Sequence, residues 1–290
     1  LPLRQPLKEL LGLTSEILRA MDGKPVVVAV DCPSGVDCDT GEVSPSCLPA
    51  DLTVTMAAVK QGLLKFPAYE YVGELQMVEI GLPPDLPELG QVTREVIVRN
   101  EVLPLIPDRP KDAHKGTFGT SLIVAGSQPY PGAAALAGIS AYRIGAGLVT
   151  MAVPESIYCG LVEGFPEATW VVLEDFEGSI SSSGVSTIKE AFGRPTACLI
   201  GPGLGLAEGT ARFLNGLLDE VELPPLIIDA DGLRLLSQQE NWTSKLPAGS
   251  ILTPHPGEMS ALCGLSLEEI QSDRLGIAER FAREWNQIIL

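Results

Sequence analysis

The chain has 290 residues and a formal net charge of −17, with 45% hydrophobic and 5% aromatic residues. This composition is typical of a folded α/β protein and excludes a disordered chain. The acidic excess, without a basic stripe, argues against nucleic-acid binding. No apolar run reaches the ~18 residues that span a bilayer. The six cysteines are scattered without a CxxC pair, so we expect no zinc and a reducing cytoplasmic location.

The first part of the chain is predicted to be α/β. A helix is predicted over residues 7–21, where apolar residues recur at helical spacing. Residues 26–30 form an apolar, valine-rich run that is typical of a buried parallel strand. This strand ends at Asp31, where open α/β sheets place their ligands. Alternatively, Asp31 only caps the Pro-Ser-Gly turn that follows it. Further strands are predicted at residues 52–56 and 75–80.

A linker is predicted after the third strand. Residues 81–90 contain several prolines and two glycines, which interrupt sheets and helices. We therefore divide the chain into a first domain at residues 1–82, a linker at 83–95 and a second domain at 96–290. The first domain is too short for a complete doubly wound sheet, so we expect the chain to begin inside a domain.

The second domain alternates strands with helices, which indicates a parallel sheet. Strands are predicted at residues 121–125, 148–153, 197–200, 226–228 and 251–253, with another beginning at 287. Two helices stand out, one at residues 133–144 and a last one at 266–285.

The most informative stretch is residues 197–205, where an apolar strand ends in a loop with glycines at 201, 203 and 205. The helix that follows places one apolar face inward, formed by Thr210, Phe213, Leu214, Leu217 and Leu218. A strand, a glycine loop and a helix in this order form a phosphate-binding arrangement, because backbone N–H groups can approach a ligand closely. The alternative is a tight turn without a ligand.

Other loops are predicted to converge on the same place. The loops at residues 126–133, 201–205, 229–233 and 254–258 each follow a strand, so a parallel sheet puts them on one edge. The last of them contains His255, which is either a ligand contact or an ordinary surface or core histidine.

Two further groups in the second domain have alternative interpretations. Asp229 and Asp231 would bind a hydroxyl-rich ligand or magnesium, or else cap the next helix. Residues 114–119 (His-Lys-Gly-Thr-Phe-Gly) offer a cation and a flexible backbone to an anion, or form an exposed turn.

These motifs resemble a known family. Residues 114–119, 200–205, 229–231 and 252–258 are together similar to the ADP/ATP-dependent NAD(P)H-hydrate dehydratases, which have a ribokinase-like fold. Upstream, residues 30–41, 50–55 and 60–63 resemble the C-terminal part of the Rossmann-like NAD(P)H-hydrate epimerase domain. The order resembles that of bifunctional NAD(P)H-hydrate repair enzymes. The implied fold is therefore part of an epimerase domain followed by an incomplete ribokinase-like α/β domain.

The resemblance implies a repair reaction on NADH or NADPH hydrated at C6 of the nicotinamide ring. The first domain would interconvert the two epimers, and the second would remove water at the expense of ADP or ATP with Mg²⁺. The family mechanism implies phosphorylation of the C6 hydroxyl followed by loss of phosphate. A K⁺ ion and a homo-oligomer are also expected, with no nucleic-acid or membrane partner.

The resemblance also implies roles for individual residues. In the epimerase, Asp31 would contact the hydrated nicotinamide as the catalytic residue, and Ser34 would give an oxygen to K⁺. In the dehydratase, the residues that match contacts to the hydrated cofactor are Ala133, Gly203, Gly205, His255 and Lys115.

The sequence also departs from the family. An Asn- and Gly-rich loop of the epimerase and the Gly-x-Gly-Asp motif of the dehydratase, whose aspartate is the base, do not occur in these 290 residues. We therefore expect this chain, taken alone, to be inactive as a dehydratase, because a positioned base contributes ~10²–10⁴-fold to the rate.

Two other functions fit parts of the sequence. A vitamin or sugar kinase would share the fold and the glycine loop, although the motif at residues 253–258 argues against it. A non-catalytic nucleotide-binding protein is the second alternative. The choice between ADP and ATP stays open.

Overall fold

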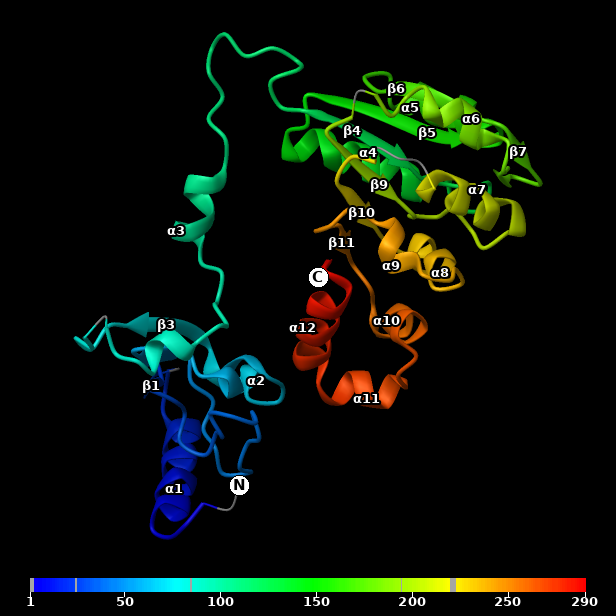
Figure 1. Ribbon diagram of the computed structural model, residues 1–290. Helices are drawn as coiled ribbons and strands as arrows, with labels where there is room; N and C mark the ends of the chain where they lie inside the picture. Colours follow the sequence, from blue (N-terminus) through cyan, green and yellow to red (C-terminus); the bar gives the residue numbers. More distant parts are fainter. Residues whose placement is uncertain (1–2, 24, 84, 194, 220–222) are drawn as a thin grey trace. The chain divides into compact units, whose positions relative to one another are not determined.

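The computed structural model describes residues 3–23, 25–83, 85–193, 195–219 and 223–290. It divides into two compact units, Leu1–Asp108 and Arg109–Leu290, which are described separately (Figure 1). In the described ranges no helix is long and apolar enough to cross a membrane.

The first unit is built on a parallel sheet of three strands in the order β1-β2-β3. Its strands are β1 (Val28–Val30), β2 (Leu52–Met56) and β3 (Glu74–Val78). Its helical segments are α1 (Leu7–Ala20), α2 (Tyr69–Val72), α3 (Arg99–Val102) and the short 3₁₀ segments Gln61–Leu64, Leu89–Gln91 and Leu103–Leu105. The predicted helix and three strands are confirmed, with β3 ending two residues earlier than expected.

One prediction for the first unit is wrong, because the valine run at residues 26–30 is not buried. The strand begins only at Val28, and Val26, Val28 and Val30 are 73%, 51% and 67% exposed. β1 is an edge strand, and no described element covers the face that holds Val28 and Val30. The opposite face is packed, because Thr53 and Thr55 of β2 are fully buried there.

The second unit is a doubly wound parallel sheet of seven strands in the order β12-β11-β10-β9-β4-β5-β6. The strands are β4 (Thr120–Val124), β5 (Leu148–Pro154), β6 (Thr169–Leu173), β9 (Ala197–Ile200), β10 (Leu226–Ile228), β11 (Ile251–Leu252) and β12 (Ile288–Ile289). An antiparallel hairpin of β7 (Asp175–Phe176) and β8 (Ser179–Ile180) follows β6. The predicted parallel sheet is confirmed, and β6 and the hairpin are additions.

Helices cover both faces of this sheet (Figure 1). They are α4 (Pro131–Ile144), α5 (Glu155–Gly164), α6 (Gly184–Lys189), α7 (Glu208–Leu218), α8 (Asp231–Leu236), α9 (Trp242–Lys245), α10 (Pro256–Cys263), α11 (Leu267–Ser272) and α12 (Arg274–Trp285). Alternation along β4 explains the two layers, because Leu122 and Val124 belong to one buried cluster and Ile123 to another. The predicted inward face of α7 is confirmed, with all five residues buried.

The single helix predicted at residues 266–285 is wrong, because two helices occupy this stretch. Asp273 has φ −148° and ψ 64°, so it ends α11, and its Oδ1 accepts a bond of 3.0 Å from the N–H of Gly276 to cap α12. Aspartate competes with helical hydrogen bonding in this way, which makes it a better cap than interior residue. Periodicity alone does not reveal such a break.

Candidate functional site

The glycine loop lies where the order of the second sheet reverses. From β4 the chain moves outward through β5 and β6, and it then returns to β9 on the other side of β4 and continues through β10 and β11. Loops that leave such a switch point in opposite directions open a crevice at the carboxyl ends of the strands, where α/β sheets bind ligands. The loops at residues 126–133 and 201–205 flank this point.

These two loops are hydrogen-bonded to each other. The N–H of Gly126 donates to the carbonyl of Pro202 at 2.8 Å, and the Ser127 hydroxyl donates to the carbonyl of Gly203 at 2.7 Å. A Cβ on Gly203 would lie 2.8 Å from the Cβ of Ala133 and 2.9 Å from that of Tyr130. The structure therefore brings Ala133 and Gly203 together, as predicted for one edge of the sheet.

The loops at residues 229–233 and 254–258 are tied to this edge of the sheet by hydrogen bonds to Asp229 and Asp231. Asp231 Oδ2 accepts a bond of 2.9 Å from the N–H of Gly205, and Asp229 Oδ1 accepts one of 2.7 Å from the Thr253 hydroxyl. The N-cap of α8 is Ala230, and in the described contacts neither aspartate side chain accepts a bond from a backbone N–H of this helix. Of the open interpretations, helix capping is therefore not what these side chains do here: they tie adjacent loops together.

The close approach of β9 and β10 depends on Gly201. Its φ is +132°, and a Cβ there would lie 1.8 Å from the carbonyl oxygen of Asp229. Gly205 differs, because the nearest atoms to its missing Cβ are the hydroxyls of Ser179 and Ser127 at 3.8 and 3.9 Å. Gly201 thus serves backbone packing, whereas a Cβ at Gly205 would make only ordinary van der Waals contacts.

His255 forms the N-cap of α10, two residues beyond the Thr253 that joins the loops. Its Nδ1 accepts bonds from the N–H groups of Gly257 at 2.9 Å and Glu258 at 3.4 Å, and its Nε2 lies 3.1 Å from Glu258 Oε1. The imidazole is 54% exposed while the Glu258 side chain is buried. An accepting Nδ1 requires the proton on Nε2, so the ring is held in one tautomer and one orientation.

Lys115 lies at the other edge of the sheet. A Cβ on Gly147, which precedes β5, would lie 2.0 Å from the carbonyl oxygen of Lys115. Gly147 is at the amino end of its strand, whereas the glycine loop follows the carboxyl end of β9. The structure therefore does not bring Lys115 together with Ala133, Gly203 and Gly205.

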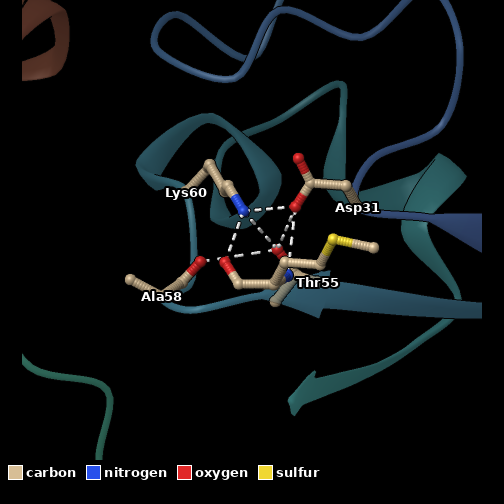
Figure 2. A network of polar contacts seen from close by, with 5 residues as sticks. Asp31, Thr55, Ala58 and Lys60 are labelled. Carbon is tan, nitrogen blue, oxygen red and sulfur yellow. Dashed lines mark hydrogen bonds and ion pairs between the residues drawn. The ribbon is translucent and has the colours of Figure 1, made fainter. Parts of the chain in front are cut away.

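A separate polar network surrounds Asp31 in the first unit. Asp31 has φ +68°, and its N–H still donates to the carbonyl of Val54 at 2.8 Å. Its Oδ1 accepts from Lys60 Nζ and from the N–H of Met56 at 3.0 Å, and lies 3.4 Å from the Thr55 hydroxyl. Lys60 also donates to Thr55 Oγ1 at 3.1 Å and to the Met56 carbonyl at 2.8 Å. Figure 2 shows the other carboxylate oxygen of Asp31 directed away from this network.

The network keeps Asp31 ionised. The hydrogen bond from Lys60 lowers the pKa of the Asp31 carboxyl, and the bond from the Met56 N–H lowers the pKa further. The carboxylate thus presents one oxygen fixed by donors and one oxygen without a donor among these contacts. A left-handed conformation in a residue other than glycine is strained, and such strain is often found at functional sites.

Ser34 lies in the turn after Asp31 and is exposed. A hydroxyl suits K⁺, but one donor does not make a site, and the described residues contain no cluster of three His, Cys, Asp or Glu side chains. Sequence reasoning missed Lys60 and Thr55 as partners of Asp31. Their only signal was that both belong to the matched epimerase motifs, because a bond across 29 residues leaves no local pattern.

We predict that Gly201→Ala destabilises the second unit strongly. The Cβ meets backbone rather than a mobile side chain, and the positive φ adds strain, so we expect a loss of at least ~2–3 kcal/mol in unfolding free energy. Gly205→Ala is the matched control, with a positive φ but no close contact for the Cβ, and should lose only ~1 kcal/mol. Urea unfolding measures both, and equal losses would contradict the close-approach argument.

We predict that Lys60→Met raises the pKa of the Asp31 carboxyl, measured by carbon-13 NMR titration. Because the pKa of Asp31 is lower in the folded protein, its ionised carboxylate stabilises the folded state at pH values above the unfolded-state pKa of ~3.9. This stabilisation is lost as the pH falls through the pKa that Asp31 has in the folded protein. The stability difference between wild type and variant should therefore shrink below about pH 4.

Lys65→Met is the matched control for this titration. Lys65 Nζ donates to the Asp39 carbonyl rather than to a carboxylate. An Asp31 pKa that is the same in all three proteins would show that Lys60 does not set it.

Comparison with known proteins agrees with these two units. Residues 121–290 match the NAD(P)H-hydrate dehydratase family, and residues 2–62 match the YjeF-related protein N-terminus. The chain is 36% identical to a bifunctional NAD(P)H-hydrate repair enzyme of Moorella thermoacetica, covering 91% of this chain and 50% of that protein. It is 38% identical to the corresponding enzyme of Thermofilum pendens, covering 95% and 52%. The chain thus spans about half the length of the curated relatives it matches.

A solved structure supports the fold. A ribokinase-like superfamily protein from Enterococcus faecalis is 25% identical, with a TM-score of 0.55 over 67% of this chain and 64% of that one. The ribokinase-like fold expected for the second unit is therefore confirmed. Since the dehydratase match covers more than half of the residues, the chain belongs to the NAD(P)H-hydrate dehydratase family, preceded by a YjeF-related N-terminal segment.

Proposed function

We propose that this protein repairs hydrated NADH and NADPH. In this proposal the second unit removes water at the expense of ADP or ATP, and the first unit interconverts the epimers of the substrate. The observation that carries it is the hydrogen-bonded glycine loop at the switch point of a sheet that matches the dehydratase family. The bifunctional repair enzymes of the two relatives support the pairing of activities.

The dehydratase part of the proposal uses the loops at the carboxyl edge. Ala133, Gly203, Gly205 and His255 would hold the hydrated cofactor, with backbone N–H groups near its pyrophosphate. The close packing of Gly203 on Ala133 and the fixed orientation of the His255 ring support this arrangement. Lys115 was also expected to contact the cofactor, and its position at the amino edge of the strands gives that role no support.

Mg²⁺ fits the chemistry of the same edge. The carboxylate of Asp231 accepts from the N–H of Gly205, so it places negative charge where phosphate groups would bind. A divalent cation between carboxylate and phosphates would neutralise that charge, which phosphoryl transfer requires. Asp231 would therefore lie close to the cation. Among the described contacts the N–H groups of Gly201, Leu204 and Gly205 already donate within the protein, so the N–H of Gly203 would be the loop donor that positions a phosphate.

The epimerase part of the proposal uses the Asp31 network. The unoccupied oxygen of the Asp31 carboxylate would contact the hydrated ring, while Lys60 and the Met56 N–H hold the other oxygen. Ser34 would offer its hydroxyl to K⁺, and its exposure in the neighbouring turn supports access.

The remaining expectations belong to the same proposal. The functional division stays at residues 1–82, 83–95 and 96–290, with a homo-oligomer in the cytoplasm. Arg94 donates to Gln61 at 2.6 Å, so part of the proposed linker is bonded to the proposed first domain, and both lie in the first unit. Size-exclusion chromatography with light scattering measures the oligomer.

The central test is turnover of hydrated NADH by the full-length protein with Mg²⁺ and either ADP or ATP. Formation of NADH, followed by its absorbance, supports repair. Phosphorylation of a vitamin or sugar without NADH formation would instead indicate a kinase, and binding without turnover would indicate a non-catalytic nucleotide-binding protein.

We predict that Asp31→Asn in the full-length protein lowers epimerisation by at least ~10²-fold, because the amide lacks the charge of the carboxylate. Dehydration of the preferred epimer should be unchanged, since Asp31 belongs to the other unit. Epimer exchange by NMR and NADH formation by absorbance measure the two activities. An equal loss of both would contradict two separate sites.

We predict that His255→Asn and His255→Ala separate cofactor binding from helix capping. Both variants lose the imidazole, so kcat/KM for hydrated NADH should fall about tenfold in each. Asparagine still caps a helix, so only His255→Ala should lose ~1 kcal/mol in unfolding free energy. Full activity in His255→Asn would show that His255 is a cap and nothing more.

A further inference from the structure

The exposed aromatic side chains among the described residues of the second unit come from two segments that approach the glycine loop. Among the described residues of 109–290, only Tyr130 and Phe176 are exposed aromatics, at 55% and 72%. The other aromatic side chains of this unit are buried or half-buried. The two that are exposed come from different connections of the sheet, one after β4 and one after β6, so their common position needs an explanation.

Tyr130 is held directly against the glycine loop. A Cβ on Gly203 would lie 2.9 Å from the Tyr130 Cβ and 3.0 Å from its carbonyl oxygen. The N–H of Tyr130 donates to the carbonyl of Ser127, whose side chain bonds the carbonyl of Gly203. Tyr130 is also the N-cap of α4, so its backbone is fixed on both sides.

Phe176 belongs to the β7–β8 hairpin, which approaches the same loop through Ser179. Phe176 pairs directly with Ser179, and residues opposite each other in an antiparallel pair project to the same side. Ser179 Oγ lies 3.8 Å from the position of a Cβ on Gly205. The neighbouring pair brings the fully buried Ile180 to the opposite side, toward the core. The Phe176 side of the hairpin is thus the side of the glycine loop.

The hairpin is anchored rather than loose. The N–H of Gln128, in the loop after β4, donates to the carbonyl of Gly178 at 2.8 Å. The N–H of Ser181 donates to the carbonyl of Glu174 at 2.9 Å, and the Thr210 hydroxyl of α7 donates to the carbonyl of Ile180 at 3.3 Å. Because the backbone of the hairpin is already fixed, stacking of Phe176 on a ring would order only its side chain.

We propose that Tyr130 and Phe176 form a stacking site for the adenine ring of the hydrated dinucleotide, an inference that rests on the function proposed above. Aromatic side chains stack well on planar bases. The nicotinamide ring of NADH is already a non-aromatic dihydropyridine, and hydration makes its C6 tetrahedral as well, so adenine is the aromatic ring of this substrate. The glycine loop between the two side chains would take the pyrophosphate that links the two ends. Tyr130 and Phe176 are positioning residues for binding and take no part in the chemistry.

The test compares substrates with and without adenine, using Phe176→Leu in the full-length protein. We expect KM for hydrated NADH to rise about tenfold with kcat nearly unchanged. KM for hydrated reduced nicotinamide mononucleotide, which lacks adenosine, should stay the same. Phe176→Trp should restore KM, and its fluorescence should fall when AMP binds. Tyr130→Leu should behave like Phe176→Leu, whereas Tyr130→Phe should retain the wild-type KM.

Phe66→Leu is the matched control, because Phe66 is 71% exposed in the first unit and the substitution is identical. Urea unfolding of each variant checks that folding is intact. A KM that rises less than twofold in Phe176→Leu, or equally for both substrates, overturns the proposal. If Phe176→Leu instead raised KM only for ADP or ATP, Phe176 would stack on the adenine of the phosphoryl donor, and this result would also overturn the proposal. Absence of wild-type turnover would instead overturn the proposed function, and fluorescence quenching by AMP would still test the stacking.

Discussion

The candidate site of the second unit depends on one close contact between backbones. Gly201 lets β9 turn away from the sheet against the carbonyl of Asp229, with no room for a Cβ. Because that contact fixes where the glycine loop starts, it also fixes where Gly203 meets Ala133 and where Gly205 meets Asp231. If the loop began one residue later, the groups that make these two contacts would point in other directions.

In the first unit the chain also leaves a parallel strand through a positive φ, but the residue there is not glycine. Asp31 takes the left-handed conformation itself while its N–H stays bonded to Val54, so the chain leaves the strand at the residue that carries the carboxylate. The bonds from Lys60 and Met56 hold one oxygen in place and stabilise the charge, which offsets part of the strain. In both units the candidate groups stand at the carboxyl end of a parallel strand.

Much of this arrangement could be predicted from the sequence, because it depends on local patterns. The apolar strands, the glycines at 201, 203 and 205 and the rule that parallel strands end on one edge sufficed to group the four loops. What failed depends on contacts distant in sequence. The exposure of Val28 and Val30 depends on what covers the sheet, and the break at Asp273 depends on its bond to Gly276. The role of Lys60 depends on a partner 29 residues away. Lys115 is different, because it precedes the strand predicted at residues 121–125, so the same rule already places it on the amino edge, away from the four loops.

The acidic character of the chain places a constraint on any anionic ligand at the glycine loop. Asp231 already occupies the N–H of Gly205, and Asp229 lies on the neighbouring strand end. Charge alone would therefore repel a pyrophosphate, so backbone donors must be supplemented by a cation or by contacts that do not depend on charge. Stacking on the exposed rings of Tyr130 and Phe176 is a contact of that kind, because an apolar surface contributes to affinity whatever the local potential. With stacking, the carboxyl edge of the second sheet would recognise the adenine ring of the ligand as well as its phosphates.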